Sequence, residues 1–143
     1  MGEPSGGGRS LILHTDGAAR GNPGPAGIGV LILDEHGRTL ERIAEPIGET
    51  TNNVAEYRAL LRGLRRAREL GAERVRVFSD SELMVRQLSG AYRVKQEHLR
   101  ALHEEALRLA RAFAAFDIVH VPRERNREAD RLANEGIDRT ARA

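Results

Sequence analysis

The chain of 143 residues contains no cysteine, and this absence excludes three kinds of site. It cannot form a disulfide scaffold, hold zinc through thiolates or use a cysteine nucleophile. No apolar run approaches the about 20 residues that span a bilayer. The N-terminal segment MGEPSGGGRS lacks the apolar stretch of a signal peptide, so we expect an intracellular, cytoplasmic protein without a membrane partner.

An excess of charge of one sign is also missing. The 23 basic and 21 acidic residues leave a net charge of +2, so no partner can be inferred from the overall charge. Lys95 is the only lysine, and all other basic residues are arginines. Arginine suits phosphate recognition, but codon usage explains such a bias at least as well.

The hydrophobic pattern predicts one α/β domain over residues 10–140, preceded by a disordered tail, rich in glycine, proline and serine, over residues 1–9. Three runs rich in leucine and β-branched residues predict antiparallel strands over 11–15, 28–33 and 39–47. Apolar residues at three- and four-residue spacing then predict a helix over 54–70, ended by Gly71.

The second half of the chain alternates between helical and strand patterns. It predicts strands over 75–78 and 116–121 and helices over 81–88, 97–115 and 128–139. The resulting order is βββαβααβα. Three antiparallel strands followed by two helix-linked strands imply a mixed five-stranded sheet with helices on its faces.

Four acidic residues lie at predicted strand ends or helix starts: Asp16, Glu56, Asp80 and Asp130. Each has a structural explanation when taken alone. Asp16 begins an Asp-Gly pair typical of a turn, and Glu56 follows an asparagine at capping-box spacing. Asp80 precedes a helix as an N-cap would, and Asp130 lies in a first helical turn, where negative charge suits the helix dipole.

Taken together, the four acids favour a metal site. Ligands of such sheets bind beyond the strand ends, where these residues would meet. Convergent carboxylates cannot all stay ionised and unpaired without raised pKa values or bound cations. Oxygen ligands favour Mg²⁺ or Mn²⁺, and two such ions about 3.5–4 Å apart can bind the attacking and leaving oxygens of a phosphodiester. If the carboxylates converge, the sequence predicts a metal-dependent nuclease.

Four segments of the chain resemble the sequence motifs of the type 1 ribonuclease H family. They are TDG with GNPGPAG (residues 15–17 and 21–27), TNNVAE (51–56), FSDS (78–81) and NREADRLA (126–133). The similarity extends from about residue 11 to residue 138 and follows the predicted order of elements. One motif would be a weak signal, but four in order are specific.

The resemblance implies an endonuclease that hydrolyses the RNA strand of an RNA–DNA hybrid and leaves 5′-phosphate and 3′-hydroxyl ends. It implies two Mg²⁺ ions bound with the substrate, with Mn²⁺ as a substitute, held by four catalytic residues: Asp16, Glu56, Asp80 and Asp130. It also places Glu56 beside the ribose 2′-hydroxyl at the cut, which helps to explain specificity for RNA.

The resemblance also implies which residues bind the hybrid. The backbone of Gly17 and the side chains of Asn22, Asn52 and Asn53 would line the minor groove, where 2′-hydroxyls are displayed. Thr51 would contact a phosphate of the DNA strand. For the three asparagines, turn and cap roles are an alternative that can coexist with substrate binding.

The chain departs from the family pattern in three places. Glu82 stands two residues after the third acid, where many members have glutamine, and we leave it outside the site because it repels phosphate. No histidine lies between Val121 and Asp130, where some members have one for product release; Arg123 is the candidate substitute and Arg125 the alternative. Residues 89–96 are too few for the basic protrusion of some bacterial members, and we expect no separate hybrid-binding domain before residue 10.

Without that protrusion, four residues remain for binding the DNA backbone: Arg86, Tyr92, Arg93 and Lys95. Core packing is the expected role of Tyr92. The leading interpretation is a monomeric, Mg²⁺-dependent ribonuclease H of the compact kind. The alternatives are a non-catalytic hybrid- or duplex-binding module, another nuclease or integrase with the same sheet, and one domain of a longer fusion. The four acids argue against a binding module, because negative charge near phosphates weakens binding.

Overall fold

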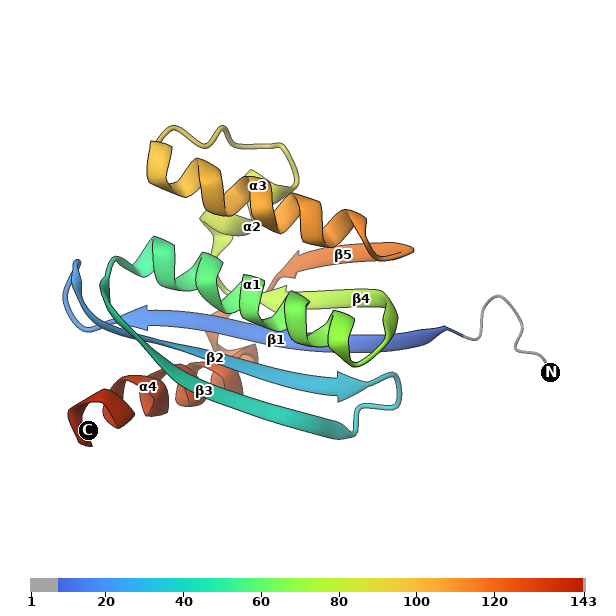
Figure 1. The fold of residues 1–143 in the computed structure, drawn as a ribbon, viewed down its shortest axis with the longest axis horizontal. Helices are drawn as coiled ribbons and strands as arrows, with labels where there is room; N and C mark the ends of the chain where they lie inside the picture. Colours follow the sequence, from blue (N-terminus) through green and yellow to red (C-terminus); the bar gives the residue numbers. More distant parts are fainter. Residues whose placement is uncertain (1–7, 143) are drawn as a thin grey trace.

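Five strands in the order β3-β2-β1-β4-β5 form one mixed sheet in the computed structural model, which describes residues 8–142 (Figure 1). The strands are β1 (Arg9–Ala19), β2 (Gly24–Asp34), β3 (Thr39–Thr50), β4 (Ala72–Ser79) and β5 (Ala115–His120). The helices are α1 (Asn52–Glu69), α2 (Glu82–Leu88), α3 (Glu97–Arg111) and α4 (Arg127–Arg142), with a 3₁₀ turn, η2 (Arg123–Arg125). The predicted order of strands and helices and the mixed sheet are confirmed.

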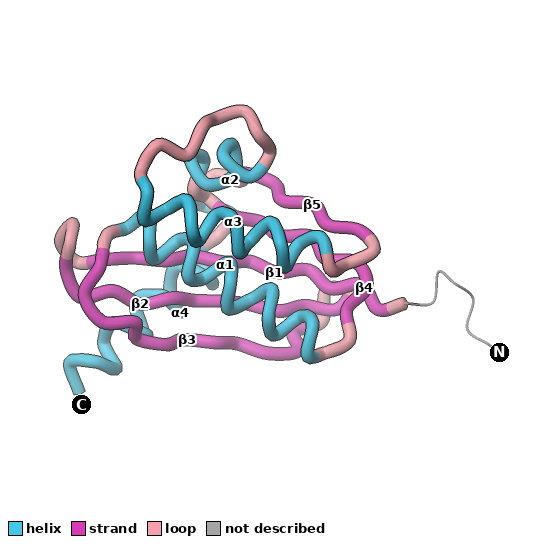
Figure 2. The backbone as a smooth tube through the Cα atoms, turned by 45° about the horizontal axis from the view of Figure 1, so that its top comes forward, coloured by secondary structure: helices cyan, strands magenta, loops and turns pink. Residues whose placement is uncertain are grey.

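The sheet combines two kinds of pairing. Strands β1, β2 and β3 pair antiparallel, whereas β4 pairs parallel to β1 and β5 parallel to β4. Helix α1, with α3 packed against it, covers one face, and α4 covers β2, β3 and part of β1 on the other (Figure 2). Within the described part of the chain, no helix is both long and apolar enough to cross a membrane.

The main core lies between α1 and the sheet. Leu13 of β1, Val30 of β2 and Val77 of β4 face Leu60 and Leu64 of α1, and all five are 0% exposed. Burying each such side chain contributes about 1.5–3 kcal/mol. The core therefore fixes α1 against β1, β2 and β4.

Strand β1 is longer than the sequence pattern predicted. Its pairing with β2 continues past Asp16, which pairs with Gly29, to Ala19, which pairs with Ala26. The expected Asp-Gly turn is therefore wrong, because a partner strand holds this segment extended. At the other end Arg9 is already the first residue of β1, and residues 1–7 of the predicted tail lie outside the described residues.

The helix caps also differ from the expected ones. The Thr51 hydroxyl accepts the Val54 N–H, so Thr51 is the N-cap of α1 and the predicted capping box is wrong. The Ser81 hydroxyl accepts the Met84 N–H and caps α2, so the expected N-cap role of Asp80 is also wrong. Helix capping therefore occupies neither Glu56 nor Asp80.

The connection between α2 and α3 is short. It consists of residues 89–96, which confirms that a basic protrusion has no room here. Tyr92 in this connection is 46% exposed, so its expected place in the core is wrong. The Arg86 guanidinium lies 5.5 Å from the centroid of the Tyr92 ring and also donates to Glu82 over 2.8 Å. Glu82 is thus engaged by an arginine outside the carboxylate cluster.

Candidate active site

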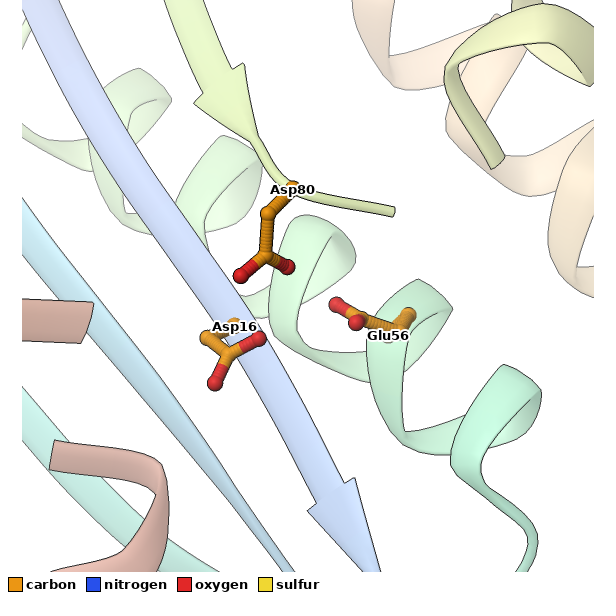
Figure 3. A group of neighbouring side chains, drawn as sticks. All are labelled: Asp16, Glu56 and Asp80. Atoms are coloured by element: carbon orange, nitrogen blue, oxygen red, sulfur yellow. The ribbon is translucent and has the colours of Figure 1, made fainter. Parts of the chain in front are cut away.

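Three of the predicted acids converge from three different elements (Figure 3). Asp16 lies within β1, Glu56 near the start of α1, and Asp80 directly after β4. One carboxylate oxygen of each lies within 4.8 Å of those of the other two. Because β1 and β4 run parallel and their pairing stops at Thr15 and Ser79, Asp16 and Asp80 follow the last pair at the same level of the sheet.

Asp130 lies at the same cavity but farther from the cluster. It sits in the first turn of α4 and, with the other three acids, lines a cavity of about 500 Å³. Burial is the main cause of the raised pKa of Asp16, and a side-chain hydrogen bond with Asp130 and the Asp130 charge add to it, although Asp130 is not part of the 4.8 Å group. Nη2 of Arg123 lies 3.7 Å from its Oδ1. The fold therefore gathers all four acids around one cavity and places an arginine beside one of them.

Gly17 determines the position of Glu56. The Gly17 N–H donates to Oε1 of Glu56 over 3.1 Å. This contact needs a close approach of β1 to α1, since a Cβ on Gly17 would lie 2.1 Å from the carbonyl carbon of Ala55. No side chain fits that gap, so glycine at this position is a steric requirement.

The predicted hybrid-binding residues join the β1–β2 turn to the start of α1. Oδ1 of Asn22 accepts the Asn52 N–H over 3.0 Å, and Oδ1 of Asn52 accepts the Ala19 N–H over 2.8 Å. Asn52 and Asn53 line the 500 Å³ cavity together with Gly17. Asn22 and Thr51 do not line it; they support the segment that does.

The surroundings of the carboxylates disfavour their ionised form. Burial, and then the charges of Glu56 and Asp80, raise the pKa of Asp16 to about 10. Burial and the charge of Asp80 raise the pKa of Glu56 to about 8, against the lowering effect of the Gly17 N–H. Burial also raises the pKa of Asp80, although a side-chain hydrogen bond with Asp16 and then the charge of Arg123 lower it. Clustered, buried oxygen ligands that resist ionisation are a donor set that fits a hard divalent cation such as Mg²⁺.

We expect the metal-free protein to lose stability as the pH rises, because a raised pKa means that the folded state keeps a proton that the unfolded chain has lost. Above the ordinary values of 3.8 for Asp16 and 4.5 for Glu56, rising pH favours unfolding until the folded-state values of about 10 and about 8 are passed. Urea unfolding in EDTA between about pH 5 and pH 9 measures this slope. Saturating Mg²⁺ should reduce it, and equal slopes with and without Mg²⁺ would contradict the expectation.

A second cavity of about 450 Å³ adjoins the first, and Asn53 lines both. Tyr92, Arg93 and Lys95 line it from the α2–α3 connection. Gln87 also lines it, is 5% exposed, and accepts the Tyr57 hydroxyl at its Oε1 over 2.6 Å. Gln87 was not identified from the sequence, although a polar residue on the apolar face of the helix predicted over 81–88 could have indicated it.

Comparison with known proteins agrees with this geometry. Residues 14–136 match a family model described as reverse transcriptase-like. A bifunctional protein of Mycobacterium tuberculosis, Rv2228c, is 44% identical over 93% of this chain, which spans 37% of that protein. Ribonuclease HI of Halobacterium salinarum is 40% identical over 95% of this chain and 68% of its own length.

A solved structure is also similar to this chain. LC11-RNase H1, isolated from compost, has been crystallised in complex with an RNA/DNA hybrid. It superposes with a TM-score of 0.87 at 47% identity, covering 92% of this chain and 99% of that one. With the matched family model and the ribonuclease HI relative, this shows that the chain belongs to the type 1 ribonuclease H family.

Proposed function

We propose that this chain is an endoribonuclease that hydrolyses the RNA strand of RNA–DNA hybrids, and that residues 10–140 form its catalytic domain. The observation that carries the proposal is the convergence of Asp16, Glu56 and Asp80 within 4.8 Å at the end of the sheet. The relative that was crystallised with a hybrid supports the choice of substrate.

The four acids would hold Mg²⁺, or Mn²⁺ as a substitute, around the 500 Å³ cavity. Two ions bound with the substrate would supply an activated water and stabilise the leaving oxygen, giving 5′-phosphate and 3′-hydroxyl ends. The protein contributes the arrangement of the ligands. Gly17 holds Glu56 through its N–H, and Glu56 would then meet the ribose 2′-hydroxyl that distinguishes RNA from DNA.

The hybrid would reach the carboxylates through the segment that begins α1. Asn52 and Asn53, with the backbone of Gly17, would contact the minor groove, and Thr51 and Asn22 hold this segment in place. Arg123 has an 80% exposed side chain next to Asp130. We assign it to product release, since an exposed cation there can accompany a departing phosphate.

The DNA strand would lie over the second cavity, where Arg93 and Lys95 supply positive charge. Few phosphate contacts are available, so we expect weak binding, and because these contacts are electrostatic the affinity should fall as salt rises. Lys95→Glu should weaken hybrid binding about tenfold at low salt, with little change in kcat. It should also lower the slope of log affinity against log salt concentration by about one. Arg111→Glu makes the same charge change at the other end of α3 and is the control. Titration of labelled hybrid against NaCl measures both; equal effects of the two variants would contradict this placement of the DNA strand.

Cleavage of a strand-labelled RNA–DNA hybrid with Mg²⁺, with Mn²⁺ and with EDTA tests the function, beside matched RNA–RNA and DNA–DNA duplexes. We expect metal-dependent cutting of the RNA strand of the hybrid alone. Hybrid binding that survives EDTA without any cutting would instead indicate a binding module. Cutting of the DNA duplex would indicate a different nuclease.

A further inference from the structure

Asn126 is a buried polar residue at the junction between η2 and α4. It is 1% exposed, and its Nδ2 donates to the carbonyl oxygen of Thr15 over 2.9 Å. Thr15 directly precedes Asp16 in β1. The hydrogen bond therefore joins two segments that are 111 residues apart in the sequence, next to a carboxylate of the cluster.

This contact lies where the β1–β4 pairing stops. The last paired residues are Thr15 and Ser79, after which β4 leaves the sheet toward Asp80. Beyond this point β4 no longer holds β1 in place. The side-chain amide of Asn126 supplies a bond to β1 at that position.

The backbone of Asn126 connects two further parts of the site. Its N–H donates to the Arg123 carbonyl over 2.9 Å, which closes η2. Its carbonyl accepts the Asp130 N–H over 3.0 Å, which forms the first turn of α4. One residue thus links the strand of Asp16, the turn of Arg123 and the helix of Asp130.

The side chain is not used for helix capping. An asparagine that begins a helix normally accepts an N–H of its own first turn. Oδ1 of Asn126 is buried and accepts no hydrogen bond from the first turn of α4. The imidazole of His14 interacts with this amide. The orientation of the amide therefore serves β1 and leaves the helix end uncapped by this side chain.

From these contacts we infer that Asn126 is a positioning residue, which sets Asp130 and Arg123 at the distance from Asp16 that the proposed reaction needs. The inference rests on the proposed function and extends it. Residues that orient metal ligands without touching the metal typically change metal affinity or activity 10- to 100-fold when removed.

Asn126→Ala tests the inference through three measurements. We expect kcat for hybrid cleavage to fall about 10- to 100-fold and calorimetric Mg²⁺ affinity to fall about tenfold. KM for the hybrid should change less than about twofold, because its proposed contacts lie on β1, α1 and the α2–α3 connection. In the metal-free protein, the amide of Asp130 should exchange with solvent faster, since its turn is no longer tied to β1.

Two further variants make the test specific. Asn126→Asp keeps the shape of the side chain and removes the donor, so it should repeat the losses, and it decides the question if Asn126→Ala does not fold. Ile137→Val shortens a side chain of α4 that is 3% exposed and controls for lost stability. It should leave kcat and Mg²⁺ affinity unchanged.

The inference is overturned if the Asn126 variants keep wild-type kcat and Mg²⁺ affinity, or if Ile137→Val shows the same losses. If the wild-type protein itself fails to cut hybrids, the proposed function fails. Mg²⁺ affinity and the exchange rate of the Asp130 amide then still decide whether Asn126 positions this end of α4.

Discussion

Asp16→Asn is expected to slow hybrid cleavage by about 10³-fold or more while the protein remains folded. Asp16 is the acid of the cluster that lies within the sheet, and it is 5% exposed. An amide of the same shape preserves packing but removes the negative charge that a divalent cation needs. Multiple-turnover cleavage of a labelled hybrid with Mg²⁺ measures the loss.

The same substitution should make the metal-free protein more stable. Burial, and then the charges of Glu56 and Asp80, raise the pKa of Asp16 to about 10, so at pH 7 the folded protein holds a proton there that the unfolded chain has lost. An amide takes up no proton on folding, so the substitution should raise the free energy of unfolding by roughly 1–3 kcal/mol at pH 7. The gain should disappear in acid, where Asp16 is protonated in both states.

Asp117→Asn is the matched control for Asp16→Asn. Asp117 lies on β5 in an exposed pair with Arg76, so its loss should leave cleavage unchanged and alter stability by less than about 0.5 kcal/mol. Near-normal cleavage by Asp16→Asn would overturn the assignment of the active site. Lower stability of that variant in EDTA would instead show that Asp16 is not destabilising in the metal-free fold.

Gly17→Ala is expected to damage both stability and catalysis. The added Cβ would lie 2.1 Å from a backbone carbon of α1 and 2.5 Å from the Glu56 nitrogen. Carbon atoms in contact need about 3.5 Å, so β1 and α1 would have to separate by roughly 1 Å. The strain should cost about 1–3 kcal/mol, and the displacement of Glu56 should lower kcat about 10²-fold.

Gly37→Ala is the control that separates the loss of stability from the loss of catalysis in Gly17→Ala. Gly37 lies in the β2–β3 hairpin at a φ of +83°, with no atom within 4 Å of an added Cβ. Alanine there should cost about 1 kcal/mol through backbone strain alone and leave cleavage unchanged. Urea unfolding and cleavage kinetics, measured on both variants, check the expectation. A Gly17→Ala protein with normal kcat would show that the close approach of β1 to α1 does not position Glu56.

Residue periodicity was sufficient to predict the order of the elements. Alternating and three- to four-residue spacings are local properties, so they identified the five strands and four helices found in residues 8–142. The predicted ends of the strands and helices were less accurate. Strand β1 extends to Ala19 because β2 pairs with it there, and α1 begins at Asn52 because the Thr51 hydroxyl caps it.

The four acids could be named from the sequence because their chemistry is explicit in the residue type. Whether each acid has a structural role or belongs to the site could not be decided in the same way. Asp16 was compatible with a turn and Glu56 with a capping box until the contacts of distant segments were known. The structure places Asp16 in a paired strand and gives Glu56 the Gly17 N–H as its partner.

Residue type and local spacing were enough to predict the fold class, the family resemblance and the residues able to bind a divalent cation. Tertiary structure alone decided that three acids meet within 4.8 Å, that Gly17 must lack a side chain, and that Asn126 reaches Thr15. These features depend on contacts between residues about 24 to 111 positions apart, which no local pattern encodes.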